Sequence, residues 1–499
     1  MSEIAIPIQG DIELRNRLDD PTLLKNKNLI NGAWCASESA STHPVLNPAN
    51  GKLITEVEFS GTADAALCVD AAKDAFFSWS KRTAKDRAVV LKRWHELIVA
   101  NQQDLGIILS AEQGKPLQEA IGEVVFGASY VEWFAEEAKR AYGDIIPTHA
   151  VDKRLSVIKQ PVGVVALITP WNFPSAMVTR KVAPAIAAGC TVVLKPAEDT
   201  PLSALALGEL ALRAGIPAGV INIITTGDPA PIGDLLTSHP MVRKLSFTGS
   251  TRVGKLLMRK CADTIKKVSL ELGGNAPFIV FDDADLDAAV AGLMTSKYRN
   301  TGQTCISANR IFVQDSVFDR FLEKLKVAVS QLSVGSPFEP GVGQGPLINQ
   351  AALDKVSRLV KDAVDCGAVV VTGAKAHGLG GLFYEPTILK DVPQSAQLLA
   401  EEIFGPVASL VRFSSESEVI EMANNTSVGL AGYFYSRDIG RAWRVSEALE
   451  LGMVGINEGM ISSEVIPFGG IKESGIGREG SKYGIEDFLD LKYLCFGGI

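Results

Sequence analysis

The chain has 499 residues, of which 46% are hydrophobic and 21% charged, and its net charge is −8. This composition is that of a folded globular protein and excludes a largely disordered chain. At roughly 100–200 residues per domain, the length predicts two or three domains, each able to bury a core. The acidic balance argues against nucleic acid or an anionic membrane as the main partner.

The cysteines form neither a disulfide framework nor a metal-binding pattern. There are seven, they are widely spaced, and no C-x-x-C occurs. We therefore expect free thiols in a reducing compartment and no metal site. The N-terminus lacks a basic start followed by an apolar core, and no apolar run approaches the ~18 residues of a membrane span. These features predict a cytoplasmic protein with no membrane partner.

Residues 161–272 alternate between short β-branched runs and helix-like stretches. The runs start near Val162, Thr191, Val220, Arg243 and Val268. The stretches between them include Ser175–Ala188, Ser203–Ala214 and Arg252–Ala262. Strands that alternate with helices at this spacing predict βαβ units, a parallel sheet and a fold of the α/β class.

The same pattern restarts after Gly273 and Gly274. Strands are expected at PFIVF, ASLVRF and MVGIN, and helices at Leu286–Asn300, Gln350–Cys366 and Arg441–Glu450. We therefore expect a second α/β domain whose boundary lies near these two glycines. Residues 1–27 are weakly patterned and receive no predicted role.

Two glycine-rich segments partly match nucleotide-binding fingerprints. Gly475, Gly477 and Gly480 form a literal G-x-G-x-x-G, but too few residues follow for the βαβ unit that this fingerprint requires, so turn glycines are expected. The segment from Gly249 to Lys255 nearly matches a phosphate-binding loop. Leu256 stands where a hydroxyl should hold magnesium, which argues against an NTPase.

The chain around Gly249 is still informative. A strand runs into a glycine turn and then into a helix expected to start near Ser250. Backbone N–H groups and the positive end of such a helix favour a pyrophosphate. A plain strand–helix turn explains the same residues equally well, so both interpretations stay open at this point.

Two side chains could carry covalent and acid–base chemistry. Cys305 follows a polar, glycine-containing segment, an unfavourable setting for the buried hydrophobic role that lone cysteines more often have. Glu271 ends an apolar strand, where a carboxylate needs a partner or a raised pKa, and a raised pKa suits a general base. No Ser-His-Asp, G-x-S-x-G or H-E-x-x-H pattern is found. Neither residue decides a function alone.

Taken together, these residues resemble the aldehyde dehydrogenase superfamily from about Asn28 to the C-terminus. The motifs that carry the resemblance are, in family order, Thr169-Pro-Trp-Asn-Phe-Pro174, Lys195-Pro-Ala-Glu198, Phe247-Thr-Gly-Ser250, Glu271-Leu-Gly-Gly274, Gly302-Gln-Thr-Cys305, Glu402-Ile-Phe-Gly-Pro406 and Pro467-Phe-Gly-Gly-Ile-Lys472. The segments Ser175–Lys181, Lys297–Cys305 and Gly480–Phe488 are further similar to the succinate-semialdehyde dehydrogenases, a branch of this superfamily.

The resemblance implies a particular domain arrangement. A Rossmann-type NAD-binding domain would comprise residues 28–142 and 161–272, and a catalytic domain residues 273–476. A β oligomerisation arm would comprise residues 143–160 and 477–499, with a hairpin near Gly143–Gln160 and a C-terminal strand near Tyr493. A homodimer or homotetramer is implied.

The resemblance also implies roles that make chemical sense. The Cys305 thiolate would attack an aldehyde carbonyl. The side-chain amide of Asn172 and the backbone N–H of Cys305 would hold the developing oxyanion. Glu271 would activate water to hydrolyse the resulting thioester and could also help to deprotonate the thiol.

A nicotinamide cofactor would supply the redox chemistry. The residues implied in its binding are Thr169, Pro170, Trp171, Lys195, Glu198, Gly249, Ser250, Val253, Leu272, Glu402 and Phe404. Glu402 would accept a hydrogen bond from the nicotinamide ribose. We expect NAD to be preferred over NADP, because Glu198 would accept hydrogen bonds from the adenine ribose and repel a 2′-phosphate.

The expected substrate is a small semialdehyde that carries a carboxylate. Arg180 lies about two helical turns after Asn172, and Arg299 lies shortly before Cys305, so both guanidinium groups start close to one pocket. The resemblance implies that these arginines and Ser463 hold the carboxylate of succinate semialdehyde and that Phe468 lines the site. Each arginine could instead pair with a protein acid. Glutarate semialdehyde, one methylene longer, stays open as a substrate.

Two other classes of function remain as alternatives. A Cys-Glu hydrolase without a cofactor would leave Lys195, Glu198, Gly249 and Glu402 unexplained. A catalytically silent structural or binding member predicts loss of the nucleophile or the base, yet Cys305, Glu271 and Asn172 are all present.

Overall fold

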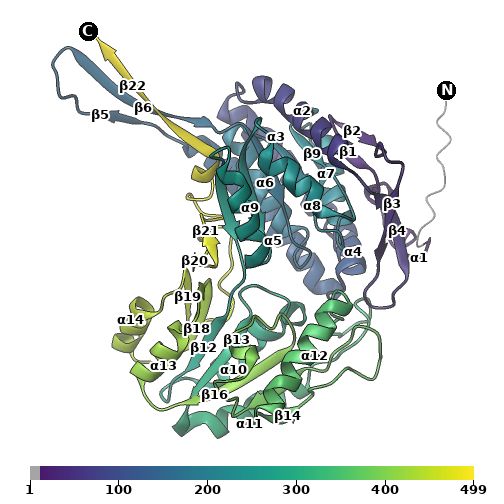
Figure 1. Cartoon of the computed structure of the whole chain (residues 1–499), viewed down its shortest axis with the longest axis vertical. Helices are drawn as coiled ribbons and strands as arrows, with labels where there is room; N and C mark the ends of the chain where they lie inside the picture. Colours follow the sequence, from purple (N-terminus) through teal and green to yellow (C-terminus); the bar gives the residue numbers. More distant parts are fainter. Residues whose placement is uncertain (1–11, 499) are drawn as a thin grey trace.

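The computed structural model describes residues 12–498 and arranges them as two lobes and a projecting arm (Figure 1). The upper lobe in this view contains an eight-stranded sheet, the lower lobe a seven-stranded sheet, and the arm a three-stranded sheet. Helices pack against both large sheets, so the predicted α/β class is confirmed.

The eight-stranded sheet has the order β2-β1-β9-β8-β7-β10-β11-β21. Its strands from β9 to β11 are parallel, whereas β1, β2 and β21 pair antiparallel. The bounds are β1 Asn28–Ile30, β2 Ala33–Cys35, β7 Val164–Ile168, β8 Thr191–Lys195, β9 Ile221–Ile223, β10 Val242–Thr248, β11 Lys267–Glu271 and β21 Gly475–Ile476. The strands expected between residues 161 and 272 are all present.

Helices cover both faces of this sheet. Those of one face are α3 Ala84–Ala100, α4 Gln102–Gln113, α5 Leu117–Glu137, α6 Ala176–Ala188 and α7 Leu202–Arg213. Those of the other face are α2 Thr62–Trp79, α8 Pro229–Ser238 and α9 Thr251–Ala262. The helices expected at 175–188, 203–214 and 252–262 correspond to α6, α7 and α9.

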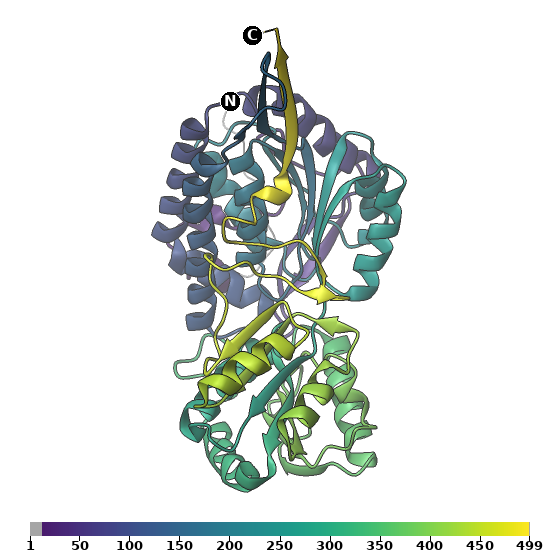
Figure 2. The same ribbon diagram turned by 90° about the vertical axis from the view of Figure 1, so that its left-hand side faces the viewer.

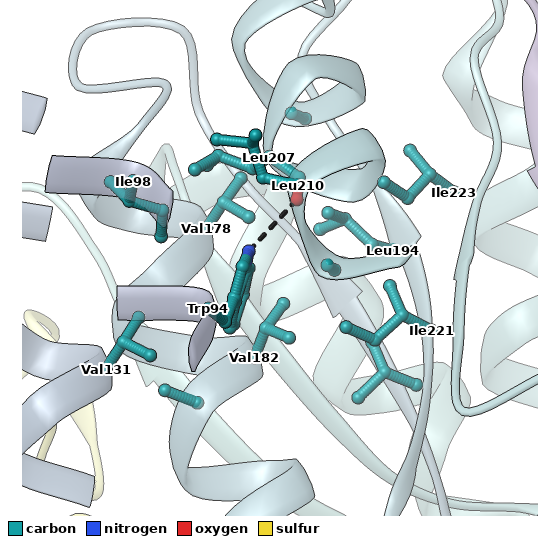
Figure 3. Close-up of a cluster of buried hydrophobic side chains, with 14 of the residues drawn as sticks. Trp94, Ile98, Val131, Val178, Val182, Leu194, Leu207, Leu210, Ile221 and Ile223 are labelled. Atoms are coloured by element: carbon teal, nitrogen blue, oxygen red, sulfur yellow. Dashed lines mark hydrogen bonds between the residues drawn. The ribbon is translucent and has the colours of Figure 1, made fainter. Parts of the chain in front are cut away.

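Trp94 of α3 joins several elements of the larger core in this lobe (Figure 3). Its ring is 1% exposed, and its Nε1 donates a hydrogen bond of 3.1 Å to the carbonyl of Leu207 in α7. The side chains around it, from α3, α5, α6, α7, β8 and β9, are Ile98, Val131, Val178, Val182, Leu194, Leu207, Leu210, Ile221 and Ile223. This packing fixes α6, which leads away from the predicted Asn172 segment.

The N-terminal segment, which received no predicted role, belongs to the same core. It contains α1 Ile12–Arg15 and the 3₁₀ helix η1 Pro21–Leu23, and its buried side chains are Leu14, Leu18, Leu23 and Leu24. The Asp104 carboxylate of α4 accepts hydrogen bonds from the backbone N–H groups of Asp19 and Asp20. Residues 12–27 thus have a structural role, and residues 1–11 lie outside the described part.

The seven-stranded sheet has the order β14-β15-β16-β13-β12-β18-β19 and is parallel except for β14. Its strands are β12 Ala276–Val280, β13 Ala308–Gln314, β14 Val369–Thr372, β15 Thr387–Lys390, β16 Val407–Phe413, β18 Ala431–Tyr435 and β19 Met453–Ile456. α10 Leu286–Tyr298 and α11 Phe318–Ser330 cover one face, and α12 Gln350–Asp365, α13 Glu416–Asn424 and α14 Ile439–Ala448 the other. The strands and helices expected after Gly274 are found here.

The arm extends beyond the upper lobe and includes the C-terminal strand (Figure 2). It consists of β5 Asp144–Ile146, β6 Lys153–Pro161 and β22 Leu489–Gly497, paired antiparallel in the order β22-β6-β5. Two short two-stranded antiparallel sheets complete the strands: β3 Thr42–Leu46 with β4 Leu53–Glu58, and β17 Val428–Gly429 with β20 Ile471–Lys472.

One boundary differs from the expectation. Residues 475–476, expected in the second domain, form β21 and pair with β11 in the upper-lobe sheet. Gly475, Gly477 and Gly480 all have positive φ angles, of 131°, 93° and 76°, in agreement with their interpretation as turn glycines. None of the helices described between residues 12 and 498 combines the length and apolarity needed to cross a bilayer.

Candidate active site

Cys305 lies where two cavities meet. The larger cavity has a volume of about 330 Å³ and is lined by residues of both lobes. The second is a narrow pocket, and Cys305 lines it as well. A thiol in this position can contact one molecule bound in each cavity.

Most of the predicted cofactor-binding residues line the larger cavity. Those on its wall are Pro170, Trp171, Gly249, Ser250, Leu272, Glu402 and Phe404, together with Asn172 and Cys305. Thr169, Lys195, Glu198 and Val253 are not on this wall. The wall also contains residues that received no predicted role: Met177, Thr248, Gly273, Ile348, Asn349, Ala351, Ala352, Lys355 and Ile403. Those between Ile348 and Lys355 belong to a lower-lobe segment without a recognisable motif, whereas the others lie within motifs that carried the resemblance.

The wall of the larger cavity offers groups suited to a dinucleotide. α9 begins beside Gly249, and the Ser250 hydroxyl caps it by accepting from the Val253 N–H. The first turn of such a helix presents N–H groups to an anion. The Trp171 and Phe404 rings meet edge-on at 5.5 Å.

Glu402 is the buried carboxylate of this cavity. It accepts a hydrogen bond of 3.1 Å from the Gly274 N–H. Burial raises the pKa of Glu402 to about 7, although the Gly274 hydrogen bond opposes the shift. Such a group can accept a hydrogen bond from a sugar hydroxyl when ionised.

Lys195 and Glu198 form an ion pair beyond the end of β8. Lys195 is buried and also donates to the Pro196 carbonyl at 3.0 Å, whereas Glu198 is about one-third exposed. Thr169 is linked to the same strand end, because its N–H donates to the Lys195 carbonyl at 3.2 Å. These residues thus form one group, outside the wall of the larger cavity.

The narrow pocket contains both predicted arginines. Its walls are Phe126, Phe173, Ala176, Met177, Arg180, Arg299, Thr304, Cys305, Ile306, Ser462 and Phe468. Arg180 stacks on the Phe468 ring at 4.1 Å and Arg299 lies over the Phe173 ring at 5.3 Å. Ser463, which was expected here, is not on the wall; its hydroxyl donates to Glu464 at 3.3 Å, and Ser462 lines the pocket instead.

The two arginines differ in their partners. Arg180 is 2% exposed and forms an ion pair of 2.6 Å with Glu479, which the sequence analysis did not single out. Its Nη2 atom has no hydrogen-bond partner among the described residues. Arg299 is half-buried, and its Nη1 donates a hydrogen bond of 3.2 Å to the Met460 sulfur. Arg180 therefore has a protein acid as its partner, and Arg299 does not within residues 12–498.

Glu271 ends β11 and is 4% exposed. Its Oε2 atom has no hydrogen-bond partner among the described residues. Burial and the nearby Glu479 carboxylate raise the pKa of Glu271 well above its usual range, although Arg180 and Lys181 lower it in part. For Glu479, burial alone would raise the pKa, but Lys181 and Arg180 hold it below the usual value. Glu271 is thus the carboxylate of this pair that binds a proton more readily.

The segment before Cys305 has an unusual backbone. Asn300, Thr301 and Gly302 have positive φ angles of 51°, 58° and 72°. At Gly302 a Cβ atom would lie 2.2 Å from the Gly405 carbonyl oxygen, so only glycine fits. Asn172 reaches this segment: its Nδ2 donates to the Gln303 carbonyl at 3.0 Å. The amide of Asn172 and the backbone around Cys305 therefore lie close together.

The Cys305 thiol is protonated at neutral pH in this structure. Burial, together with the Glu402 and Glu271 carboxylates, raises the pKa of Cys305 to about 12, whereas Arg180 lowers it in part. A thiol of this kind needs a base or a bound cation to become a nucleophile. No group of three or more His, Cys, Asp or Glu side chains in residues 12–498 is arranged to hold a metal ion.

A thiol on the walls of two cavities, with an amide beside its segment and a buried carboxylate of raised pKa near it, is typical of an aldehyde dehydrogenase. The chain belongs to the aldehyde dehydrogenase family, whose model matches residues 34–494. The chain is 59% identical to a glutarate-semialdehyde dehydrogenase of Pseudomonas aeruginosa over 97% of its length and 100% of that protein. It is 58% identical to the NADP(+) succinate-semialdehyde dehydrogenase GabD of Escherichia coli over 96% of its length and 100% of that protein.

A solved structure agrees with these relationships. The crystal structure of an E. coli NADP-dependent enzyme is 58% identical to the chain and superposes with a TM-score of 0.96, covering 96% of this chain and 100% of that one. The expected membership of the aldehyde dehydrogenase superfamily is thus confirmed.

The raised pKa of Cys305 predicts how its alkylation depends on pH. Because thiolate is the reactive form, and its fraction rises tenfold per pH unit below the pKa, labelling by iodoacetamide should accelerate about tenfold per unit between pH 7 and 10. Mass spectrometry of the peptide that contains Cys305 measures this rate separately from the exposed Cys366 and Cys495. A plateau below pH 9 would contradict the prediction.

Proposed function

We propose that the protein oxidises succinate semialdehyde to succinate with a nicotinamide dinucleotide as the oxidant. The observation that carries the proposal is the position of Cys305 on the walls of both cavities. The larger cavity would hold the dinucleotide and the narrow pocket the semialdehyde. Cys305 can then bind the aldehyde carbon covalently beside the hydride acceptor.

The residues of the larger cavity fit the cofactor. The start of α9 at Ser250 suits the pyrophosphate, Glu402 suits the nicotinamide ribose, and Trp171 with Phe404 offers an apolar wall. When bound, the nicotinamide ring supplies a hydride acceptor for the oxidation. We assign Lys195 and Glu198 to the binding of the adenine ribose. Thr169, Val253 and Leu272 are assigned to holding the cofactor-binding segments around them in place.

The chain's own groups perform the remaining steps. Cys305 loses its proton and its sulfur forms a bond to the aldehyde carbon, which places negative charge on the carbonyl oxygen. Asn172 Nδ2 and the Cys305 N–H are assigned to that oxygen. After oxidation the carbon is held as a thioester. Glu271 removes a proton from water, the water oxygen attacks the thioester, and the C–S bond breaks to release the acid and the thiolate.

The assignment of Glu271 is tested by Glu271→Gln. Without a base the thioester should form but hydrolyse slowly, so the variant should give one equivalent of NADH in a burst and a steady-state kcat at least ~100-fold lower. In the wild type the hydrolysis rate should rise with pH through the raised pKa of Glu271, because only its ionised form accepts a proton. Stopped-flow absorbance of NADH measures both phases.

Cys305→Ala is the control for the Glu271 experiment. It should abolish both the burst and the steady-state turnover while leaving the circular dichroism spectrum unchanged. Wild-type turnover by Glu271→Gln, or residual activity of Cys305→Ala within tenfold of the wild type, would contradict the assignments.

The substrate assignment depends on the two arginines. Buried guanidinium groups in the narrow pocket favour a substrate that carries a carboxylate, which can pair with them in a two-point geometry. Arg180 Nη2 and the Arg299 guanidinium are both available for this, while Ser463 and Phe468 complete the predicted set. The relative from P. aeruginosa is named for glutarate semialdehyde, so this longer semialdehyde remains the alternative substrate.

Arg299→Ala tests the substrate assignment, because Arg299 forms no ion pair with an acid among residues 12–498, although its charge opposes the raised pKa of the nearby Glu119. The wild type should favour succinate semialdehyde over butanal by at least ~100-fold in kcat/KM, equivalent to about 2.7 kcal/mol. Arg299→Ala should collapse this ratio and leave butanal oxidation nearly unchanged. Arg320→Ala, at an exposed position of α11, should change neither rate.

The comparison with butanal also has a decisive negative outcome. Equal kcat/KM of the wild type for both aldehydes would mean that the arginines serve the fold, and the semialdehyde assignment would fail. Arg180→Ala is the weaker probe, because it would also leave Glu479 unpaired beside Glu271.

We further propose that NAD is preferred over NADP. Glu198 is partly exposed after β8, where the adenine ribose would lie, and its charge would repel a 2′-phosphate. Its ion pair with Lys195 would also keep this lysine from binding the phosphate. The E. coli relative carries NADP(+) in its name, so a preference for NAD would distinguish this chain from it.

Glu198→Gln tests the cofactor preference. The ratio of kcat/KM for NAD to that for NADP should exceed one in the wild type and fall about tenfold in the variant, equivalent to ~1.4 kcal/mol. The fall follows from loss of the repulsion and release of Lys195. Glu96→Gln, at an exposed position of α3, should leave the ratio unchanged. A wild-type preference for NADP would overturn the proposal.

A homodimer or homotetramer remains the proposed assembly. The arm presents β22 as an unpaired edge strand, with Leu491, Tyr493 and Phe496 more than half exposed. Such an edge and its apolar side chains favour pairing with a second copy. Sedimentation equilibrium should give a mass of two or four chains of 53.2 kDa, and Leu491→Asp should reduce it. A monomeric wild type would contradict this prediction.

Two alternatives are disfavoured. A cofactor-independent Cys-Glu hydrolase gives no use to the larger cavity or to Glu402, and a silent member gives no use to the raised pKa of Glu271. NADH formation on addition of NAD and aldehyde would exclude both.

The free state of all seven cysteines supports the assignment to a reducing compartment such as the cytoplasm.

A further inference from the structure

A set of charged side chains near the start of α5 contacts both segments that build the proposed oxyanion site. These are Lys115, just before α5, and Glu119 and Glu123 within it, here called the α5 cluster. Lys115 is 2% exposed and Glu123 4% exposed, and they form an ion pair. None of the three was singled out by the sequence, and none lines either cavity.

The α5 cluster holds the segment of Asn172 from one side. Lys115 Nζ donates a hydrogen bond of 2.9 Å to the Asn172 carbonyl and lies 3.9 Å from the centre of the Phe173 ring. Glu123 accepts from the N–H groups of Ser175 and Ala176 at 2.9 and 3.2 Å, which caps the start of α6. The turn from Asn172 into α6 is therefore tied at both of its ends.

The α5 cluster also reaches the segment before Cys305. Glu119 accepts a hydrogen bond of 2.9 Å from the Asn300 N–H. The side-chain amide of Asn300 in turn donates to the Asn172 carbonyl at 2.9 Å and to the Gln303 carbonyl at 3.2 Å. The Asn172 carbonyl thus accepts from Lys115 and Asn300 together, one from each side of the oxyanion site.

Burying the charged groups of the α5 cluster costs free energy, so these contacts point to a use other than stability. Desolvating two opposite charges costs several kcal/mol per ion, and an apolar pair of equal volume is often no less stable. Residues with positive φ, such as Asn300 and Thr301, persist only where their surroundings hold them. A buried network that touches two strained or tightly turned segments fixes the distance between them more strictly than apolar packing does.

We propose that Lys115 and Glu123 are positioning residues, which hold the Asn172 amide at the place where charge develops on the substrate oxygen. Glu119 performs the same task for the Cys305 segment. The inference rests on the proposed roles of Asn172 as oxyanion donor and Cys305 as nucleophile. It adds to the proposed function residues that line neither cavity: Lys115 and Glu123 act through Asn172, and Glu119 acts through the segment before Cys305.

The test uses acylation of Cys305 by p-nitrophenyl acetate, in which the thiolate forms a thioester and p-nitrophenolate leaves. This reaction develops an oxyanion but needs neither cofactor nor a carboxylated substrate. Four proteins are compared: the wild type, Asn172→Ala, the double variant Lys115→Met/Glu123→Gln, and the triple variant that combines all three substitutions. The double variant removes one positive and one negative charge, so the net charge is unchanged. Gln at position 123 keeps an acceptor for the α6 amides, so the helix start is retained.

Both Asn172→Ala and the double variant should slow acylation at least ~30-fold, since loss or misplacement of one oxyanion donor costs about a hundredfold. The triple variant should be no more than about threefold slower than Asn172→Ala, because all losses pass through the same amide. Multiplied losses, on the order of a thousandfold, would overturn the proposal, as would an active double variant.

Glu112→Gln is the matched control. Glu112 is a buried carboxylate at the end of α4 that caps the start of α7, accepting from Leu202 and Ser203 at 2.7 and 2.8 Å, and it has no contact with Asn172. This variant should lose stability but keep the acylation rate. If the double variant does not fold, Glu123→Gln replaces it in the same comparison, alone and combined with Asn172→Ala.

The experiment separates the proposal from the proposed function. If the wild type does not oxidise semialdehydes, the proposed substrate is overturned, but the acylation rates of the four proteins with p-nitrophenyl acetate can still be compared. The dissociation constant of the dinucleotide, measured by the quenching of tryptophan fluorescence, should agree within about twofold between the wild type and the double variant. A larger loss of binding would place the effect in the general fold and contradict the positioning role.

Discussion

The structure of the site depends on one backbone constraint, the left-handed conformation of three successive residues before Cys305. Asn300, Thr301 and Gly302 turn the chain so sharply that a Cβ at Gly302 would collide with the Gly405 carbonyl. This turn brings Cys305 out of the lower lobe and onto the walls of both cavities. The hydrogen bonds of Asn172, Glu119 and Gln303 exist around this turn because a strained segment must be held.

Charge pairing near the Cys305 thiol shifts the pKa values of Glu271 and Glu479 in opposite directions. Glu479 lies between Arg180 and Lys181, which hold its pKa low, and its negative charge together with burial keeps the pKa of Glu271 high. The pKa values of two carboxylates of the same type are thereby shifted in opposite directions in one buried region. The same arrangement explains why Arg180 has a protein partner although it lines the narrow pocket.

The sequence allowed prediction of the parts that depend on local patterns. The parallel strands between Val164 and Glu271 follow from their β-branched runs, and the residues of the larger cavity contributed by the upper lobe follow from the resemblance. Asn349 and Lys355 were missed because they enter the cavity from α12 and the segment before it, which have no motif and depend on how the lobes meet. Ser463 was displaced by Ser462 for a similar reason: adjacent serines on a loop cannot be ordered without the backbone. Glu479 and the α5 cluster were missed because pairing between distant residues leaves no periodic signal.

The pairing of β21 with β11 has a consequence for how the chain is made. The lower lobe is an insertion whose two ends meet, since the Leu272 N–H donates to the Ser474 carbonyl at 2.9 Å and the Ser474 hydroxyl to the Gly273 carbonyl at 2.8 Å. During synthesis on the ribosome, the upper lobe therefore waits for its last sheet strand until the whole lower lobe has emerged. The lower lobe, in contrast, has all of its sheet strands once Ile456 has been added. A nascent chain of this protein completes its second sheet before its first.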